Sequence, residues 1–392
     1  MKTKILVFIA SVLAAGCAAG GANENDEGVV YFDVDGGSEK SFFDFFERAD
    51  IIPLETSDSS VVGSLSDVEF IGDTLFGLDR RGPRIVSFTA DGTYLGAFSK
   101  RGEGPDDHGY VSTFHVNPYN GYLVVLEPFY SRLSVYDRKT EKKVQVIKLK
   151  EKWDGTPALH NFYPLSADKY AFFCQLAKEN NVLIYDGATD SLYRQTIEIP
   201  DVIVETGYFD APNPFNKVGG DIYFGISYLN AMFRFDGEYF VPYKKLDFGK
   251  YGHIEDYYLP KSHNRKEALD YISENDDKYA VFLSVPMHTP SRLMFAVRHD
   301  VGGERRALAV IDRNTGETMF VRGLKEGFSV FPNVSQQGEY VCRVEDVYYL
   351  SLIHIFSRRW LRCSRSRAFP GPKSSGARCC RTVPTYRNSF RP

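Results

Sequence analysis

Two acidic residues recur at the same place in neighbouring segments of the sequence, each followed five residues later by an arginine. They are Asp79 with Arg84 and Glu127 with Arg132. Carboxylates and guanidinium groups arranged in this way could bind a polar ligand around a central opening. They could also form ion pairs that fix the turn of each segment. We favour this structural alternative, because residues that conform to a repeat usually hold the repeat together.

Residues that depart from the repeat are better candidates for ligand contact. Those in the equivalent loops of successive segments are Tyr130, Tyr228, Asn230, Arg298 and His299. Loops at the mouth of a central channel are where aromatic and polar side chains would meet a ligand. With Asp79 and Glu127, these residues form the predicted ligand-binding set, and the sequence offers no candidate catalytic residue.

Patterns typical of metal sites and of catalytic nucleophiles do not appear in the sequence. The histidines lack metal-ligand spacing, and no Gly-x-Ser-x-Gly elbow is present. Gly102-x-Gly104-Pro105 does not predict a phosphate-binding loop, because no helix follows it and proline removes an N–H donor. We therefore expect neither a metal nor another cofactor. The sequence favours a binding protein over an enzyme.

The candidate residues belong to a repeat of short strands and tight turns. Its clearest part is an apolar strand that ends in an aromatic residue or Ile near an Asp. Five copies are found at Arg84–Gly92, Arg132–Asp137, Asn181–Asp186, Met232–Gly237 and Leu308–Gly316. Their equivalent positions are Phe88, Tyr136, Tyr185, Phe235 and Ile311, separated by 48, 49, 50 and 76 residues. Three nearly equal intervals indicate a true repeat.

Repeats of this length that contain only strands cannot bury their apolar faces alone, and radial stacking around an axis solves that problem. The sequence therefore predicts an all-β fold, a six-bladed β-propeller with one short helical insertion. The longest interval contains the insertion, because Arg265–Asn275 has helical apolar spacing. The sixth blade has to come from Phe328–Pro332 and Glu339–Leu350, with Val29–Val34 and Ile51–Leu54 as candidates to pair with them.

The N-terminal segment is typical of an export signal, with two lysines before an apolar run that is too short to span a bilayer. It ends in Leu13-Ala-Ala-Gly-Cys17, which resembles the lipobox of bacterial lipoproteins with Leu one place early. This resemblance implies that residues 1–17 are a signal peptide and that Cys17 carries the lipid. The alternative is a simple cleavage site with a chance cysteine. Residues 18–28 have the composition of a flexible tether.

Charge is distributed unevenly along the chain. Residues 351–392 hold ten Arg or Lys and no Asp or Glu, so the remainder is strongly acidic, which argues against a nucleic-acid partner. The strand pattern of the propeller region, residues 29–350, also stops in the middle of a blade. We interpret residues 351–392 as an aberrant tail from a frameshift or chimeric join and predict that it is disordered, leaving the final blade incomplete. A cationic nucleic-acid arm is the alternative.

Several short motifs carry a family resemblance. They are Ile52-Pro-Leu-Glu-Thr56, Leu75-Phe-Gly-Leu-Asp79, Asp91-Gly92 and Gly102-Glu-Gly-Pro105. With them the chain resembles the six-bladed β-propeller lipoproteins of unknown function that are common in gut bacteria, which are distantly similar to NHL-repeat propellers. The resemblance is strongest up to Leu149 and looser over the rest of residues 29–350. It implies a fold and a location, and it implies no catalytic residues.

The anchor and the repeat together predict an outer-membrane or cell-surface lipoprotein that faces the periplasm or the surface. Its attachment to the membrane is through Cys17. Its propeller is predicted to bind a glycan, a peptide or a protein partner, and no nucleic acid. The alternative is a propeller-fold hydrolase or lyase acting on a carbohydrate or similar extracellular substrate. That activity would need three or more His, Asp or Glu side chains converging in the channel.

Metabolic labelling tests the anchor. In a Gram-negative host the full-length chain is expected to incorporate labelled palmitate, because stable attachment requires several acyl chains. The Cys17→Ser variant is expected to lose the label, whereas Cys174→Ser is expected to keep it. Continued labelling of Cys17→Ser would contradict a lipid anchor at this residue.

Overall fold

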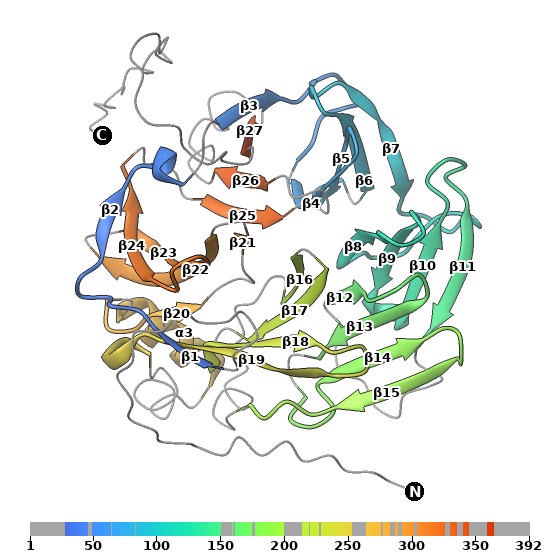
Figure 1. Ribbon diagram of the computed structural model, residues 1–392. Coiled ribbons are helices and arrows are strands. Elements are labelled where there is room, and N and C mark those ends of the chain that lie inside the picture. The colour runs from blue at the N-terminus through green and yellow to red at the C-terminus, as the bar shows by residue number, and fades with distance from the viewer. Residues whose placement is uncertain are drawn as a thin grey trace, which may run out of the picture.

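The chain forms a ring of small antiparallel sheets around a central axis (Figure 1). The computed structural model describes residues 28–45, 49–63, 65–82, 84–149, 159, 161–174, 177–199, 214–218, 220–226, 229–252, 264–275, 277–282, 287–288, 292–301, 304–325, 330–334, 340–344 and 359–363. Cys17 and the segment predicted to be a tether, apart from Gly28, lie outside the described residues. Among the described residues, no helix is long and apolar enough to cross a membrane.

Five sheets are described with their side chains and form the blades of a β-propeller. Blade 1 contains β4 (Leu65–Ile71), β5 (Thr74–Asp79), β6 (Arg84–Thr89) and β7 (Tyr94–Lys100). Blade 2 contains β8 (Thr113–Val116), β9 (Leu123–Glu127), β10 (Arg132–Tyr136) and β11 (Lys143–Lys148). Blade 3 contains β12 (Asn161–Pro164), β13 (Lys169–Phe173), β14 (Val182–Asp186) and β15 (Ser191–Gln195).

The next two blades each have an extra strand on the outer edge. Blade 4 contains β16 (Phe215–Val218), β17 (Asp221–Ile226), β18 (Ala231–Phe235), β19 (Phe240–Asp247) and the added β1 (Gly28–Tyr31). Blade 5 contains β20 (Val281–Phe282), β21 (Met287–His288), β22 (Arg292–Val301), β23 (Glu304–Asp312), β24 (Thr318–Leu324) and the added β2 (Ser38–Lys40). The five repeat copies recognised in the sequence are the third strands β6, β10, β14, β18 and β23, one in each blade.

A sixth sheet is described by its backbone pairing. It has the strand order β25 (Val330–Val334), β26 (Tyr340–Val344), β27 (Arg359–Cys363) and β3 (Ala49–Pro53). The expected N-terminal contribution at Ile51–Leu54 therefore lies in the same sheet as β25 and β26. Strand β27 comes from the segment that we predicted to be disordered, and it pairs with both β26 and β3. Five residues of that segment thus differ from the expectation.

The expected pairing of Val29–Val34 with the closing strands is wrong. Strand β1 instead runs parallel to β19, and β2 runs parallel to β24. The N-terminal segment therefore covers the outer edges of two neighbouring blades. Phe32 and Val34 lie between β1 and β2 in the sequence and are buried in the cluster that joins blades 4 and 5. Burial of these two apolar side chains stabilises this path of the chain.

Short helices occur in the connections. They are η1 (Phe42–Asp44), η2 (Pro128–Tyr130), η5 (Gly249–Tyr251) and α3 (Arg265–Glu274). Helix α3 lies in the longest repeat interval, in the stretch with helical spacing. Asn264 caps it, because the Asn264 side chain accepts a hydrogen bond from the Glu267 N–H at 3.0 Å.

Tight turns join the third and fourth strands of the blades. Gly92 and Gly237 have φ values of 92° and 110°, in the left-handed region that glycine adopts without strain and that tight hairpin turns require. At each turn the side chain of the preceding Asp accepts hydrogen bonds from backbone N–H groups, as Asp236 does from Glu238 and Tyr239.

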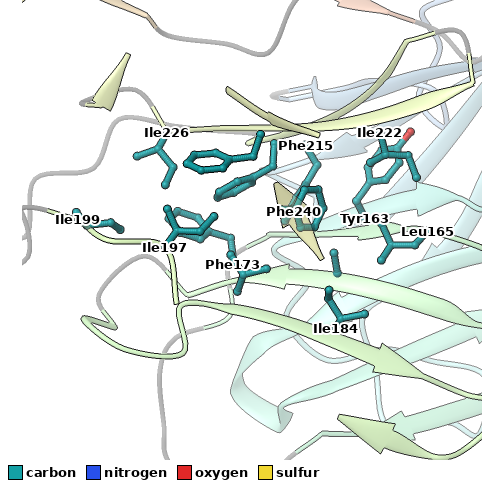
Figure 2. Close-up of a cluster of buried hydrophobic side chains, with 14 of the residues drawn as sticks. Tyr163, Leu165, Phe173, Ile184, Ile197, Ile199, Phe215, Ile222, Ile226 and Phe240 are labelled. Atoms are coloured by element: carbon teal, nitrogen blue, oxygen red, sulfur yellow. The ribbon is translucent and has the colours of Figure 1, made fainter. Parts of the chain in front are cut away.

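Apolar side chains fill the space between successive blades from blade 1 to blade 5. Figure 2 shows the cluster between blades 3 and 4, to which β13, β14, β16 and β17 all contribute. Comparable clusters join blades 1 and 2, blades 2 and 3, and blades 4 and 5. The hydrophobic core is thus a series of layers between sheets, as radial stacking requires.

Removing one buried ring from such a layer tests the role of the inter-blade core. Phe224 is fully buried between the rings of Phe173, Phe215 and Phe240, with centroids 4.9, 5.0 and 5.6 Å away. We expect Phe224→Ala to lower the free energy of unfolding by about 3–5 kcal/mol, measured by denaturant titration. Tyr193→Ala is the control, because Tyr193 is exposed on β15. An equal loss in both variants would contradict this account.

Candidate binding site

The described site candidates lie on the second strands of their blades or in the connections to the third strands. Asp79 and Glu127 are the last residues of β5 and β9. The others are Tyr130 in η2, Asn230 just before β18, and Arg298 and His299 in β22. Tyr228 lies outside the described residues. Because strands alternate in direction, these connections share one face of the ring, here called the loop face. They belong to different blades, but Asn230 and His299 meet at the adjacent carbonyl groups of Ala280 and Tyr279.

The carboxylate of Asp79 makes its contacts within its own blade. Its carboxylate accepts hydrogen bonds from the N–H groups of Gly63, at 3.1 and 3.2 Å, and of Arg81, at 3.2 Å. Arg84 is its direct cross-strand partner, with Nε 3.8 Å from Oδ2. Asp79 is buried, and these contacts compensate its loss of hydration. They favour the structural alternative for this pair.

Glu127 makes a stronger version of the same interaction. Arg132 Nε lies 3.0 Å from Oε1 and Arg132 Nη2 lies 2.7 Å from Oε2, so the pair is bidentate. The Gly109 N–H donates to Oε2 at 2.7 Å, and the Ser134 hydroxyl donates to Oε1. Glu127 is fully buried, and its carboxylate therefore joins the β9–β10 turn to the long loop between blades 1 and 2.

The protonation of Glu127 reflects two opposing effects. Burial alone raises the pKa of this carboxyl, because it disfavours the charged form. The hydrogen bonds from Arg132, Ser134 and the Gly109 N–H outweigh burial and hold the pKa below its ordinary value of 4.5. The hydrogen bonds to Glu127 raise the pKa of Arg132 in turn. Near neutral pH the pair is fully ionised.

Asn230 and His299 also contribute polar atoms to the fold. The Asn230 side chain accepts from the Phe282 N–H at 2.9 Å and donates to the carbonyl oxygens of Gly252 and Ala280. The imidazole Nδ1 of His299 lies 2.8 Å from the Tyr279 carbonyl oxygen. Both residues are buried: Asn230 links blade 4 to the segment before β20, and His299 links β22 of blade 5 to the same segment. Arg298 is half-buried and stands opposite Arg306 in the sheet.

A further residue of this kind was not recognised in the sequence as a site candidate. Asn181 stands just before β14, the position that Asn230 has before β18. It is buried, its amide donates to the Ile197 carbonyl oxygen at 2.7 Å, and it accepts from the Ile197 N–H at 2.9 Å. Blades 3 and 4 thus use amides at this face where blades 1 and 2 use carboxylates.

Three exposed aromatic rings gather over the Glu127 network, and we call Tyr110, Phe129 and Tyr130 the aromatic platform. Their exposed fractions are 41%, 80% and 56%. The rings of Tyr110 and Phe129 are 5.1 Å apart between centroids. Single exposed aromatic residues are common, whereas adjacent ones on one face make that face the candidate interaction surface.

Local backbone features and the Glu127 network hold the platform in place. Pro128 begins the short helix η2, and Ser131 ends it with a φ of 46°. The Arg132 guanidinium lies 4.6 Å from the centroid of the Tyr130 ring, a cation–π contact. The Tyr130 ring also packs against Gly109, where a Cβ would lie 2.3 Å from Cε2. Position 109 therefore requires glycine if the ring is to keep its place.

Sequence reasoning identified Tyr130 but missed its two companions. The signal for Phe129 was its position beside Tyr130 in a Pro-containing turn between two strands. The signal for Tyr110 was weaker, because its contact with Phe129 joins two separate loops. The platform offers apolar ring faces and hydroxyl groups. In the part of the chain that the structure describes, no three His, Cys, Asp or Glu residues could hold a metal ion.

The fold and this loop face define an all-β β-propeller that presents aromatic side chains from one blade. A profile of the family described as Domain of unknown function (DUF4934) matches residues 29–356, and the chain belongs to this family. No curated protein matches the sequence significantly.

Solved structures resemble the fold. A Bacteroides fragilis protein described as exported has a TM-score of 0.64 and 13% identity, covering 87% of this chain and 100% of that chain. A member of the DUF4221 family from Bacteroides vulgatus has a TM-score of 0.47 and 12% identity, covering 70% of this chain and 84% of that chain. At these identities the first similarity supports the propeller fold alone.

The Glu127 pair predicts a pH dependence of stability. Because the pKa of Glu127 is lowered in the folded state, its contribution is complete above 4.5 and is lost as the pH falls through the lower folded pKa. At neutral pH we expect Glu127→Gln to lower the free energy of unfolding by about 3–5 kcal/mol, because Arg132 loses its charged partner.

Denaturant titrations of both proteins across this pH range measure the effect. The difference between wild type and Glu127→Gln should shrink below pH 4.5. Glu103→Gln is the control, because Glu103 is exposed in the loop that Gly109 belongs to. A difference that stayed constant with pH would show that the ionised form of Glu127 is not what stabilises the fold.

Proposed function

We propose that this protein is an exported, surface-located binding module that recognises a glycan through the aromatic platform. The observation that carries the proposal is the exposure of Tyr110, Phe129 and Tyr130 together above a buried ionic network. The sequence left a glycan, a peptide and a protein partner open. The geometry of the platform favours the first.

Sugar rings have an apolar face of C–H groups and an edge of hydroxyl groups. Aromatic faces carry partial negative charge and attract polarised C–H groups, so a ring that is largely exposed can stack on such a sugar face. Phe129 offers this surface most fully, and the hydroxyl groups of Tyr110 and Tyr130 add hydrogen-bonding capacity at its side.

Preorganisation supports the same function. Tyr130 is held between Arg132 and Gly109, and Arg132 is in turn fixed by the bidentate contact with Glu127. Ring orientation is thus largely set before a ligand arrives, which lowers the entropy cost of binding. A flexible peptide partner would itself lose more conformational entropy than a sugar ring of fixed shape.

We further propose that Cys17 carries a lipid that attaches the module to the outer membrane. The export-type N-terminus and the description of the Bacteroides fragilis neighbour as exported support this location. We also propose a six-bladed ring, in which the sheet β25-β26-β27-β3 completes the circle. Contacts of β25 with β21 and of β26 with β4 support this closure, because they join that sheet to blades 5 and 1.

A glycan array followed by calorimetry tests the binding function. With an oligosaccharide selected on the array, we expect Phe129→Ala and Tyr130→Ala each to weaken binding about tenfold or more, because each removes a stacking surface. Tyr193→Ala removes a similarly exposed ring from a different blade and is expected to bind as the wild type does.

Two results would overturn the proposal. Either no oligosaccharide binds, or binding survives in both platform variants. Release of shorter sugars from the bound oligosaccharide would instead favour the alternative of a hydrolase or lyase.

A further inference from the structure

A second group of polar side chains lies at the axis of the ring, on the face opposite the aromatic platform. It consists of Glu69 on β4, His115 on β8, Tyr163 on β12, Lys217 on β16, and Tyr119 in the β8–β9 turn. We call it the axial cluster. The four strands are the innermost of blades 1 to 4, and they contact one another in succession around the axis (Figure 1). His115, Tyr163 and Lys217 each occupy the penultimate position of their strand.

The pairing of Glu69 with His115 leaves one imidazole nitrogen available. The Glu69 carboxylate lies 2.5 Å from Nδ1 of His115 and accepts a second bond from the Val116 N–H at 2.8 Å. Because an ionised carboxylate only accepts, Nδ1 of His115 donates to Glu69, and Nε2 is the other polar atom of the ring. This Nε2 is buried and has no hydrogen-bond partner in the structure. A buried polar nitrogen without a partner is costly, so a ligand group that hydrogen-bonds to it gains stability.

The turn that carries Tyr119 is held to blade 3 by hydrogen bonds. The side chains of Asn117 and Asn120 donate to carbonyl oxygens of the β12–β13 turn, at 2.9 Å to Ser166 and 2.6 Å to Ala167. Tyr119 can therefore reach past blade 3 to Lys217 of blade 4. The Lys217 ammonium lies 3.3 Å from the Tyr119 hydroxyl and 4.3 Å from its ring centroid.

Tyr163 connects the two halves of the axial cluster. Its ring meets His115 at 5.1 Å and Phe215 at 6.4 Å, and Phe215 shares the face of β16 with Lys217. Burial, together with the nearby Glu69 charge, raises the pKa of Tyr163, so its hydroxyl stays protonated. The cluster thus offers an unpartnered imidazole nitrogen at one side, a cation at the other, and aromatic rings between them.

We propose that the axial cluster is a binding site for a sugar acid. The ligand carboxylate pairs with the Lys217 ammonium, a ligand hydroxyl hydrogen-bonds to Nε2 of His115, and the sugar ring lies against the exposed ring of Tyr119. A ligand with both groups fits better than a simple anion, because the carboxylate matches the Lys217 ammonium and the hydroxyl group can hydrogen-bond to the buried imidazole nitrogen. This site is independent of the aromatic platform, since it uses other residues on the other face.

Calorimetry on the full chain with galacturonate, and with galactose as the matched neutral sugar, tests the proposal. We expect galacturonate to bind about tenfold or more tightly than galactose, because only galacturonate has the charge that pairs with Lys217. Lys217→Met should remove this preference. Lys139→Met, at an exposed turn on the same face, should retain it.

Nitrogen NMR of the wild-type protein provides a second measurement that needs no variant. Addition of galacturonate is expected to shift the Nε2 resonance of His115, because that atom gains a hydrogen bond. Equal affinity for the two sugars, unchanged binding by Lys217→Met, or an unchanged Nε2 resonance at saturation would overturn the proposal. None of these outcomes bears on glycan binding at the platform, which the Phe129→Ala variant measures separately.

Discussion

Each blade of this propeller has two apolar faces, and it can bury them only against its neighbours. Clusters such as the one around Phe224 between blades 3 and 4 therefore supply the main stabilisation. Polar groups at the ends of the strands then have to be satisfied locally, because no solvent reaches them there. Glu127, Asn181 and Asn230 do this at the same face of successive blades. Radial packing thus determines where buried polar side chains are required to satisfy the ends of the strands.

The Glu127 network in blade 2 also helps to position the aromatic platform above it. Glu127 accepts from Gly109 and from Arg132, and these two residues are the ones that contact the ring of Tyr130. A residue that conforms to the repeat and a residue that departs from it therefore belong to one unit. Viewed alone, Glu127 is structural and Tyr130 is a surface ring. Their connection is what turns the loop face of blade 2 into a preorganised platform.

Much of the fold could be predicted because the repeat is local. Third strands such as β10 have their pattern within a few residues, and the Asp-Gly turns have a direct conformational cause. The route of the N-terminal segment could not be predicted, because pairing of β1 with β19 joins residues far apart and nothing in Val29–Val34 selects an edge. For the same reason, sequence spacing identified Tyr130 but not its contact with Gly109. Asn230 looked like a ligand-binding residue because, in the sequence alone, a polar loop residue that contacts a ligand and a buried one that bonds to the backbone look the same.

The most direct test of this account is the binding of an array-selected oligosaccharide to Glu127→Gln, at neutral pH and under conditions where circular dichroism shows that the variant is folded. Glu127 is buried and cannot touch the sugar. If its ionic contacts position the platform, the variant is expected to bind several-fold more weakly than the wild type. Full affinity in the folded variant would contradict the central claim that the buried carboxylate organises the site.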